Sequence, residues 1–578
     1  MDKKTRGIRE FQESRGLQAF RGLQESRGFG LPNGRQSRHG HDGPQGRRGR
    51  RLAVALMVTT LAGSGLAACS SEAADQPPAE ATTKTTAKTA DKTATHTPVT
   101  WGKCPEPAEG TRRDAGLTCA TLKVPLNYQK PGGTTIDVAI SRLATAKPGK
   151  RRGVLLLNPG GPALGGIEMP SAMAKTLPKS VRDSYDLIGF DPRGVERSTP
   201  QSCGLEDPSV ASLFPYPAAD GSITENVALA EADAKKCADT VGRNLRYFTT
   251  ANTARDMDRV RQALGEKKIS YWGQSYGTYL GAVYRTLFEK HTDRMVLEGN
   301  VNPDKVWADE VADTWGKGMA DRFPDAARVA AAQDSALGLG DDVEEVTDTY
   351  LDLADRLDRE PAPVPGTPVS VDGALLRNLT YSMLLHNSTL APLTQFWKAA
   401  ADLADGSVTD ADKAVLKQVF ADTPTTPGVP ADNQVTMFLA LTCGDAEWPD
   451  DADGYAARTT AHRKAWPLTA GMPADIWPCA FWEKPAEPNV TVTDKGSRNT
   501  LILQNRRDNA TPWESGVGLH RALGDRSAFV GVDNGGHYVY NEGSACADKA
   551  TVTFLTTGRL PAKDVHCTDV KQKHVEQK

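Results

Sequence analysis

Short continuous runs of apolar residues recur along the chain, and glycine, proline or asparagine follows close behind most of them. The six clearest runs are 154–157, 185–190, 269–272, 295–297, 500–504 and 527–530. Runs of this length between turn residues are typical of strands buried in a mostly parallel sheet. Helical patterns lie between them; Asn252-Thr253, for example, offers an N-cap to a helix over 254–264, which Gly265 would end. This alternation predicts an α/β fold with helices on both faces of the sheet.

Residues 305–440 have a different pattern, rich in Ala, Asp and Leu at helical spacing and poor in strand signals. The residues that recur on one face of its clearest helix are Val343, Val346, Tyr350, Leu353 and Leu357. We therefore expect a largely helical insertion over 305–440. It would divide the sheet-bearing part into a first portion, 100–304, and a C-terminal portion, 441–570.

The first hundred residues carry the signals of export. A basic stretch at 47–51 precedes a modest apolar stretch at 52–68, as in a signal peptide. The apolar stretch ends Leu66-Ala67-Ala68-Cys69, which resembles the lipobox of bacterial lipoproteins, where the cysteine is lipidated. The alternative is an ordinary secretory signal with a chance cysteine. We predict a leader and lipoprotein signal peptide over 1–68 and a lipid anchor on Cys69.

Residues 69–99 consist mainly of Thr, Ala, Lys, Asp and Pro, with almost no large apolar side chains. Such a segment cannot offset the entropy of ordering, so we predict a flexible tether. The protein is then expected to be exported and either held at the outer face of the cell membrane by its lipid or secreted. Paired arginines allow the twin-arginine route as well as the general one.

The net charge of −3 averages two unlike parts of the 578 residues. Residues 1–51 hold 13 Lys and Arg against 5 Asp and Glu, a net charge of +8, so the remainder carries −11. A domain this acidic is a poor candidate for nucleic-acid binding. No apolar run beyond the leader is long enough to predict a polytopic membrane protein.

Cysteine usage agrees with export. Apart from Cys69, the chain has eight cysteines: Cys104, Cys119, Cys203, Cys237, Cys443, Cys479, Cys546 and Cys567. An even number in an exported chain favours disulfides, and pairing of sequence neighbours is the simplest of the 105 connectivities. Zinc binding is disfavoured because the sequence has no C-x-x-C motif, and we predict no metal site.

A candidate nucleophile lies at the end of the apolar run 269–272. Gly273-Gln274-Ser275-Tyr276-Gly277 fits the G-x-S-x-G pattern, and a helical pattern follows it directly. A strand that turns sharply into a helix presents the serine hydroxyl above the sheet, and the flanking glycines remove side chains that would clash in the turn. We predict Ser275 as the nucleophile; the alternative is a Gly-rich turn with a solvated serine.

A serine nucleophile needs a histidine base and an acid that orients it, which in this fold follow in the order serine, acid, histidine. His537 comes after the run 527–530 in a loop that contains Gly535-Gly536, and we favour it over the other histidines. Asp508 follows the preceding run and is the favoured acid, with Asp533 as its rival. Thr511-Pro512-Trp513-Glu514 is typical of a capping box, which gives Glu514 a structural role.

Catalysis of this kind also needs two backbone N–H donors for the oxyanion. One should come from Tyr276, next to the nucleophile. The other should come from Gly161, in the Gly160-Gly161 loop after the first apolar run, where the backbone can approach a substrate closely. Asp191-Pro192-Arg193-Gly194 is better suited to a scaffold, since its charged side chains can tie loops together.

The motifs from about Trp101 to Cys567 together resemble the secreted actinobacterial tripeptidyl aminopeptidases, α/β-hydrolases related to prolyl aminopeptidases. The motifs are Val124-Pro125-Leu126-Asn127-Tyr128, Asn158-Pro159-Gly160-Gly161-Pro162, Asp191-Pro192-Arg193-Gly194, Asn252-Thr253-Ala254-Arg255-Asp256-Met257-Asp258, Gly273-Gln274-Ser275-Tyr276-Gly277-Thr278-Tyr279-Leu280-Gly281, Cys479-Ala480-Phe481-Trp482, Asp508-Asn509-Ala510-Thr511-Pro512 and Gly536-His537. The resemblance implies an α/β-hydrolase fold with a helical cap, a triad of Ser275, Asp508 and His537, and no cofactor. One departure is Glu298-Gly299, where the family usually has Asp-Gly.

The resemblance implies peptide substrates with a free N-terminus, from which short, tripeptide-like fragments are released. An aminopeptidase must recognise an α-ammonium group, and Glu298, at a strand end near the site, is a candidate partner for it. The same machinery could serve a carboxylesterase or lipid esterase. A third possibility, from another class, is a surface-displayed binding lipoprotein with an inactive hydrolase fold.

Overall fold

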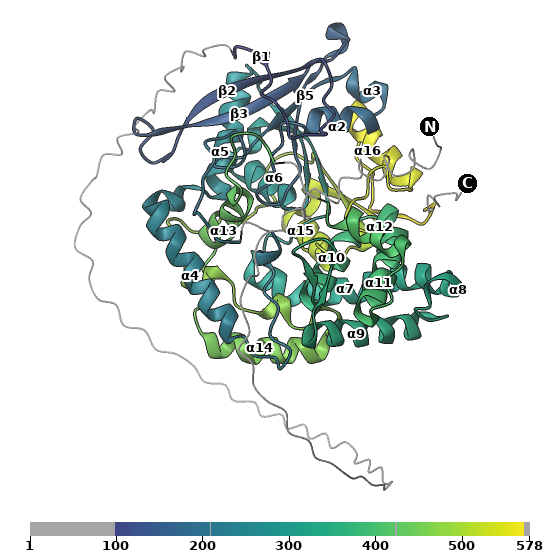
Figure 1. The fold of residues 1–578 in the computed structure, drawn as a ribbon. Helices are drawn as coiled ribbons and strands as arrows, with labels where there is room; N and C mark the ends of the chain where they lie inside the picture. Colours follow the sequence, from purple (N-terminus) through teal and green to yellow (C-terminus); the bar gives the residue numbers. More distant parts are fainter. Residues whose placement is uncertain (1–98, 208–209, 422–424, 572–578) are drawn as a thin grey trace, which may run out of the picture. The chain divides into compact units, whose positions relative to one another are not determined.

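The computed structural model describes residues 99–207, 210–421 and 425–571 (Figure 1). Its main element is a ten-stranded sheet with the strand order β1-β2-β3-β5-β4-β6-β7-β10-β11-β12. The strands are β1 (Gly102–Lys103), β2 (Leu117–Pro125), β3 (Thr135–Leu143), β4 (Gly153–Asn158), β5 (Tyr185–Phe190), β6 (Ile269–Gln274), β7 (Thr292–Glu298), β10 (Thr500–Arg507), β11 (Ser527–Gly535) and β12 (Val565–Cys567). The leader, signal peptide and tether expected over 1–98 lie outside the described residues.

All six apolar runs form strands, and these six are parallel neighbours from β5 to β11. Successive side chains of these strands pack into different clusters. Leu156 and Tyr271 face the helices α5, α6 and α15, whereas Leu155 and Trp272 face α2, α3 and α16. Each strand is therefore buried on both faces, which is why its sequence is continuously apolar.

The helices that cover the two faces are α2 (Met169–Thr176), α3 (Lys179–Arg182), α5 (Thr250–Ala263), α6 (Tyr276–Leu287), α15 (Trp513–Leu523) and α16 (Ala545–Thr557). The expected N-cap of α5 needs correction. The helix begins four residues early, and the hydroxyl of Thr249 accepts from the N–H of Asn252. Asn252 and Thr253 instead lie buried within the first turn.

The antiparallel edge formed by β1, β2 and β3 was not among the expected elements. β2 pairs with β3 along its whole length, and β3 joins the parallel strands by pairing with β5. β2 alternates between buried and more exposed positions, so it lacks the continuous apolar run that marks the central strands. This edge extends the sheet on the side away from the C-terminal strands.

The expected helical insertion exists, and it lies below the strands in the view of Figure 1. Its helices are α7 (Ala308–Ala331), α8 (Asp334–Leu337), α9 (Val343–Arg359), α10 (Gly373–Met383), α11 (Leu390–Asp405), α12 (Asp410–Val419), α13 (Asn433–Asp445) and α14 (Ala452–Ala465). The strands β8 (Ala362–Pro363) and β9 (Ser370–Val371) form a small hairpin within it. The amphipathic pattern of α9 is confirmed, because Val346, Tyr350, Leu353 and Leu357 are buried.

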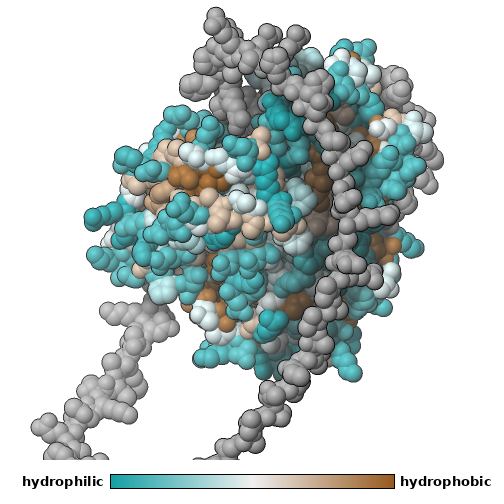
Figure 2. Space-filling view, turned by 90° about the horizontal axis from the view of Figure 1, so that it is seen from below, coloured by the Kyte–Doolittle hydropathy of each residue, from teal (hydrophilic) through white to brown (hydrophobic). Residues whose placement is uncertain are grey.

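The insertion is larger than 305–440. Residue 440 lies inside α13, and helical structure continues to the 3-10 helix η9 (Pro478–Phe481). Residues 191–249 contribute α4 (Thr224–Thr240), which packs against η9. We call residues 191–249 and 305–481 together the helical cap. The face of the molecule in Figure 2 is mostly hydrophilic, with smaller hydrophobic areas between.

The eight cysteines form four disulfides between the expected sequence neighbours: Cys104–Cys119, Cys203–Cys237, Cys443–Cys479 and Cys546–Cys567. Two of them lie in the cap, where they fix α4 to its preceding loop and α13 to η9. Four disulfides fit export to an oxidising compartment. Within the described ranges, none of the helices has the length and apolar character needed to cross a membrane.

Candidate active site

Ser275 lies at a sharp turn between β6 and α6. Its backbone has φ 55° and ψ −128°, a conformation that residues other than glycine adopt only under strain. The flanking glycines are required by space, because a Cβ on Gly273 would lie 2.3 Å from the carbonyl oxygen of Gly277. Ser275 is the N-cap residue of α6, but its side chain makes no capping hydrogen bond. The hydroxyl is thus half-buried and not used by the helix.

The Gly160-Gly161 loop packs directly against this turn. Both glycines have positive φ, 93° and 113°, and a Cβ on Gly160 would lie 2.9 Å from the Cβ of Ser275. Gly161 itself is exposed. Tyr276 is the first residue of α6, so its N–H lies at the positive end of the helix dipole. The two predicted oxyanion donors therefore belong to segments that meet at Ser275.

Asp508 and His537 form a buried pair at the ends of β10 and β11. The two Asp508 oxygens lie 2.9 and 3.0 Å from Nδ1 of His537, and both residues are at most 3% exposed. Asp508 also accepts from the N–H groups of Ala510 and Thr511 and from the hydroxyl of Thr511. This carboxylate fixes the ring so that Nδ1 carries the donated proton and Nε2 is left as a base.

The turn after β7 contacts both Ser275 and His537. The carbonyl of Glu298 accepts from the N–H of Ser275 at 2.9 Å. A Cβ on Gly299, the next residue, would lie 2.9 Å from Cε1 of His537. The parallel strands β6, β7, β10 and β11 are neighbours, so they end at one edge of the sheet. Ser275 follows β6, this turn follows β7, and Asp508 and His537 follow β10 and β11.

Glu298 does not have the substrate-facing position expected of an ammonium-binding residue. Its side chain is 1% exposed and already accepts four hydrogen bonds. Oε1 accepts from the N–H groups of Val539 and Tyr540, each at 2.7 Å, and Oε2 accepts from Trp272 Nε1 and Gln274 Nε2, each at 3.0 Å. Glu298 therefore links the strand that leads to Ser275 with the segment that follows His537.

The rival residues have other partners. Asp533 is exposed and pairs with Arg507 at 3.0 Å. His520 lies in α15, where it bonds to Ser527 and faces Asp564. The expected capping box is absent from α15, because the hydroxyl of Thr511 binds Asp508 instead.

The Asp191-Pro192-Arg193-Gly194 segment is a scaffold, as expected. Arg193 is fully buried and makes a two-pronged ion pair with Asp256, at 2.6 and 2.7 Å. One oxygen of Asp191 accepts from the N–H groups of Gly166 and Ile167 in the segment after the glycine loop. Burial raises the pKa of Asp191 to about 7. The Asp191 contacts fix the segment that follows the Gly160-Gly161 loop.

Comparison with known proteins gives concordant results. Residues 468–567 match the family model described as TAP-like protein. A tripeptidyl aminopeptidase of Streptomyces lividans is 35% identical over 463 residues, 78% of this chain and 83% of the relative. The chain belongs to the tripeptidyl aminopeptidase family. Two further family relatives in Mycobacterium tuberculosis are the serine protease Hip1, 30% identical over 81% of this chain and 91% of the relative, and carboxylesterase B, 32% identical over 81% and 89%.

In this member of the tripeptidyl aminopeptidase family, a network that sequence reasoning missed surrounds the Tyr276 side chain. Trp307 stacks on its ring with centroids 5.8 Å apart, and Thr250 bonds to its hydroxyl at 2.7 Å. Asp445, from α13 of the cap, accepts from both Thr250 and the indole N–H of Trp307. Burial raises the pKa of Asp445 to about 6. The residue after the nucleophile is thereby tied to the cap.

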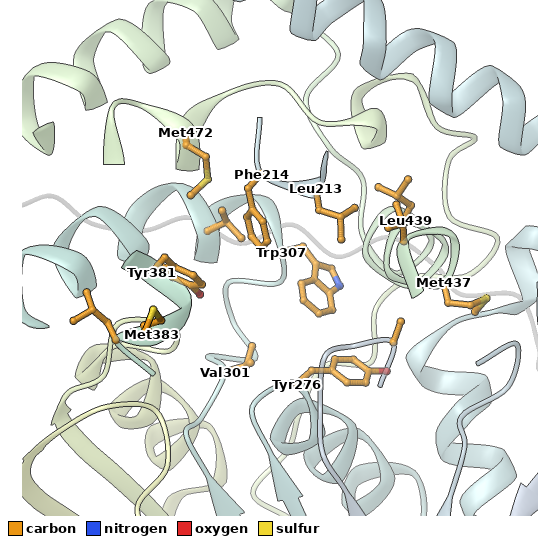
Figure 3. Close-up of a cluster of buried hydrophobic side chains, with 14 of the residues drawn as sticks. Leu213, Phe214, Tyr276, Val301, Trp307, Tyr381, Met383, Met437, Leu439 and Met472 are labelled. Atoms are coloured by element: carbon orange, nitrogen blue, oxygen red, sulfur yellow. The ribbon is translucent and has the colours of Figure 1, made fainter. Parts of the chain in front are cut away.

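Trp307, near the start of the cap, lies in the apolar layer where the cap meets the strand ends (Figure 3). In this view it is central, with Leu213, Phe214 and Met472 of the cap on one side and Tyr276 of the core on the other. The contributing segments are far apart in sequence. No local pattern marks them as neighbours, so this layer could not be predicted from spacing alone.

Glu310, a further buried carboxylate near the start of the cap, allows a prediction about stability. Glu310 in α7 is 4% exposed, and burial raises its pKa to about 7. Because this value exceeds that of an unfolded glutamate, stability should fall as pH rises from about 4.5 to about 7 and remain lower above that range. Glu310→Gln should therefore stabilise the fold by about 3 kcal/mol at pH 8 and have little effect at pH 4.

Thermal unfolding of both proteins at the two pH values measures this effect. Glu344→Gln, on the exposed side of α9, is the matched control and should show no pH-dependent difference from wild type. Equal stabilities of the Glu310→Gln variant and wild type at pH 8 would contradict the prediction.

Proposed function

We propose that the chain is a serine hydrolase that releases short, tripeptide-like fragments from peptides with a free N-terminus. Ser275 is the nucleophile, His537 the general base, and Asp508 the acid that orients it. The observation that carries the proposal is the buried Asp508–His537 pair, 2.9 Å apart, at the edge of the sheet where the strained Ser275 lies. Strain at a nucleophile presents its hydroxyl to the substrate.

In the first step, Nε2 of His537 takes the proton of the Ser275 hydroxyl as Oγ attacks the carbonyl carbon of the substrate. The N–H groups of Gly161 and Tyr276 bind the oxyanion that forms, aided by the N-terminus of α6. The protonated His537 then gives its proton to the leaving amine, and the peptide bond breaks. Water repeats these steps on the acyl-enzyme and frees Ser275.

The family relatives support peptide bonds as the target, since two of them are named an aminopeptidase and a serine protease. A second candidate is ester hydrolysis, which is favoured by the similarity to the carboxylesterase B of Mycobacterium tuberculosis. The same triad serves both reactions. What separates them is whether the enzyme requires the α-ammonium group of its substrate.

A panel of three substrates tests this difference: a tripeptide with a free amine and a chromogenic leaving group, its N-acetylated form, and a short-chain ester. An aminopeptidase should lose at least a hundredfold in kcat/KM when the amine is acetylated. Equal rates on the free and acetylated peptides, with faster hydrolysis of the ester, would support the esterase. Absence of labelling by a fluorophosphonate would support the inactive binding lipoprotein.

We further propose that the enzyme is exported and held at the outer face of the cell membrane by a lipid on Cys69. The lipobox-like residues before Cys69 and the tether-like composition of 69–99 support this location. The four disulfides of the folded part are compatible with it. Fractionation of cells that express wild type or Cys69→Ser tests the anchor, because the variant should leave the membrane fraction.

A further inference from the structure

A charged pair of the cap packs on the glycines that precede His537. Arg322 and Asp325 lie one turn apart in α7 and are 1% and 7% exposed. Nη1 of Arg322 lies 2.5 Å from Oδ2 of Asp325. A Cβ on Gly535 would lie 2.0 Å from that Nη1 and 2.3 Å from that Oδ2. Position 535 therefore requires glycine, because the Arg322–Asp325 pair of the cap occupies the space that a side chain would need.

The other donors of Arg322 hold a turn of the cap that follows α10. Its Nε donates to the carbonyl of Leu384 at 2.9 Å, and its Nη2 donates to the side-chain oxygen of Asn387 at 2.8 Å. A single planar guanidinium thus fixes both ends of the turn 384–387 while it remains paired with Asp325.

This turn binds the backbone of the histidine. The carbonyl of Leu385 accepts from the N–H of His537 at 2.8 Å. The side-chain NH₂ group of Asn387 donates to the side-chain oxygen of Asn534 at 3.1 Å. Asn534 lies two residues beyond Val532, where the regular register between β10 and β11 ends. A Cβ on Gly536 would lie 2.9 Å from the same Leu385 carbonyl, so the chain approaches closely here.

The pair also reaches the segment that carries the acid. Asp325 accepts from Nε of Arg507 at 3.0 Å, and Arg507 immediately precedes Asp508. The carbonyl of Arg507 in turn accepts from the N–H of Gly536 at 3.0 Å. Contacts of one helix of the cap therefore extend to both segments that carry the Asp508–His537 pair.

From these contacts we propose that Arg322 is a positioning residue for His537: through the turn 384–387, it sets the place of the base relative to Ser275. The inference rests on the proposed function of the triad. It means that the cap contributes to the chemical step. A lysine at this position cannot make the three contacts, because its ammonium is a single point on a flexible chain.

The test compares wild type, Arg322→Lys, Asn387→Ala and Arg328→Lys. Arg328 is the matched control, since it also pairs with Asp325 from α7 but its side chain is 57% exposed. Asn387→Ala removes one contact of Arg322 without leaving a charge unpaired, and it serves if Arg322→Lys fails to fold. Each variant is measured for its rate of labelling by a fluorophosphonate and for kcat and KM on a peptide and on a small ester.

A displaced base should slow every reaction that depends on it. We expect Arg322→Lys to lower the labelling rate and kcat on both substrates by about 10- to 100-fold with KM within about threefold, and Asn387→Ala to have a smaller effect in the same direction. Arg328→Lys should match wild type. Rescue of an Arg322→Ala variant by added guanidinium, in labelling rate, would support positioning over general stability.

Three results overturn the inference, and they can be told apart. If wild type is labelled and Arg322→Lys is labelled at the same rate, Arg322 has no effect on the base, while the proposed function stands. If wild type is not labelled at all, the proposed function fails, and this inference fails with it. A loss confined to the peptide, with raised KM, also overturns it because that result assigns Arg322 to substrate binding.

Discussion

Ser275→Ala should lower kcat by about five to six orders of magnitude and leave the fold intact. The loss is this large because the acyl-enzyme forms on the Ser275 hydroxyl, whereas the nearby hydroxyls of Tyr276 and Thr278 are bonded to Thr250 and to the carbonyl of Ser275. Any residual rate would come from binding and from the oxyanion donors alone. Steady-state kinetics on the free-amine peptide and labelling by a fluorophosphonate both measure the change.

The backbone strain at Ser275 allows a sharper control. Alanine keeps the Cβ at φ 55°, so Ser275→Ala should unfold at the temperature of wild type. Glycine adopts this conformation without strain, so Ser275→Gly should be equally inactive but more stable, by about 1 kcal/mol. Ser407→Ala, an exposed serine, should behave as wild type. Full activity in the Ser275→Ala protein would refute the proposed mechanism.

Glu298→Gln should impair both stability and catalysis. All four partners of the carboxylate are N–H donors, two on each oxygen. A glutamine amide must turn its own NH₂ group toward one of these pairs, which leaves buried donors facing each other. We expect a destabilisation of about 2–5 kcal/mol. Because one pair lies just after His537, kcat should also fall by about 100-fold.

Glu298→Asp tests whether the length of the side chain matters when its negative charge is kept. The shorter side chain keeps the carboxylate but cannot span from Gln274 to Val539 with the same backbone, so an intermediate loss in kcat is expected. Thermal unfolding and kcat of both variants, with Glu344→Gln as the exposed control, check the prediction. A Glu298→Gln protein with wild-type kcat and raised KM would instead return Glu298 to the role of substrate partner.

Much of the fold could be predicted, and the proposed triad inferred, because the signals are local. A strand buried on both faces must be apolar throughout, so β4 to β7, β10 and β11 are visible in the sequence. The turn at Ser275 needs glycines at fixed positions, and those glycines appear as a motif. The order of serine, acid and histidine along the chain then selects Asp508 and His537.

The rest depends on contacts between distant segments. Glu298 looked like a substrate partner because a carboxylate at a strand end gives no sign of four buried donors around it. The sequence predicts that Gly535 and Gly536 lie in a loop, whereas Gly535 is the last residue of β11 and makes room for Arg322 and Asp325 of the cap. The α4 segment precedes the main insertion by many residues, so only its packing on η9 assigns it to the cap.

The four disulfides have a consequence for the order of assembly. They join residues 15, 34, 36 and 21 positions apart, and no bond encloses or crosses another. A chain threaded N-terminus first through a membrane can therefore close each bond soon after its second cysteine emerges, while later cysteines are still on the other side. Oxidation in step with translocation would select the native pairs without reshuffling, and the first three bonds could close before the segment that carries His537 emerges.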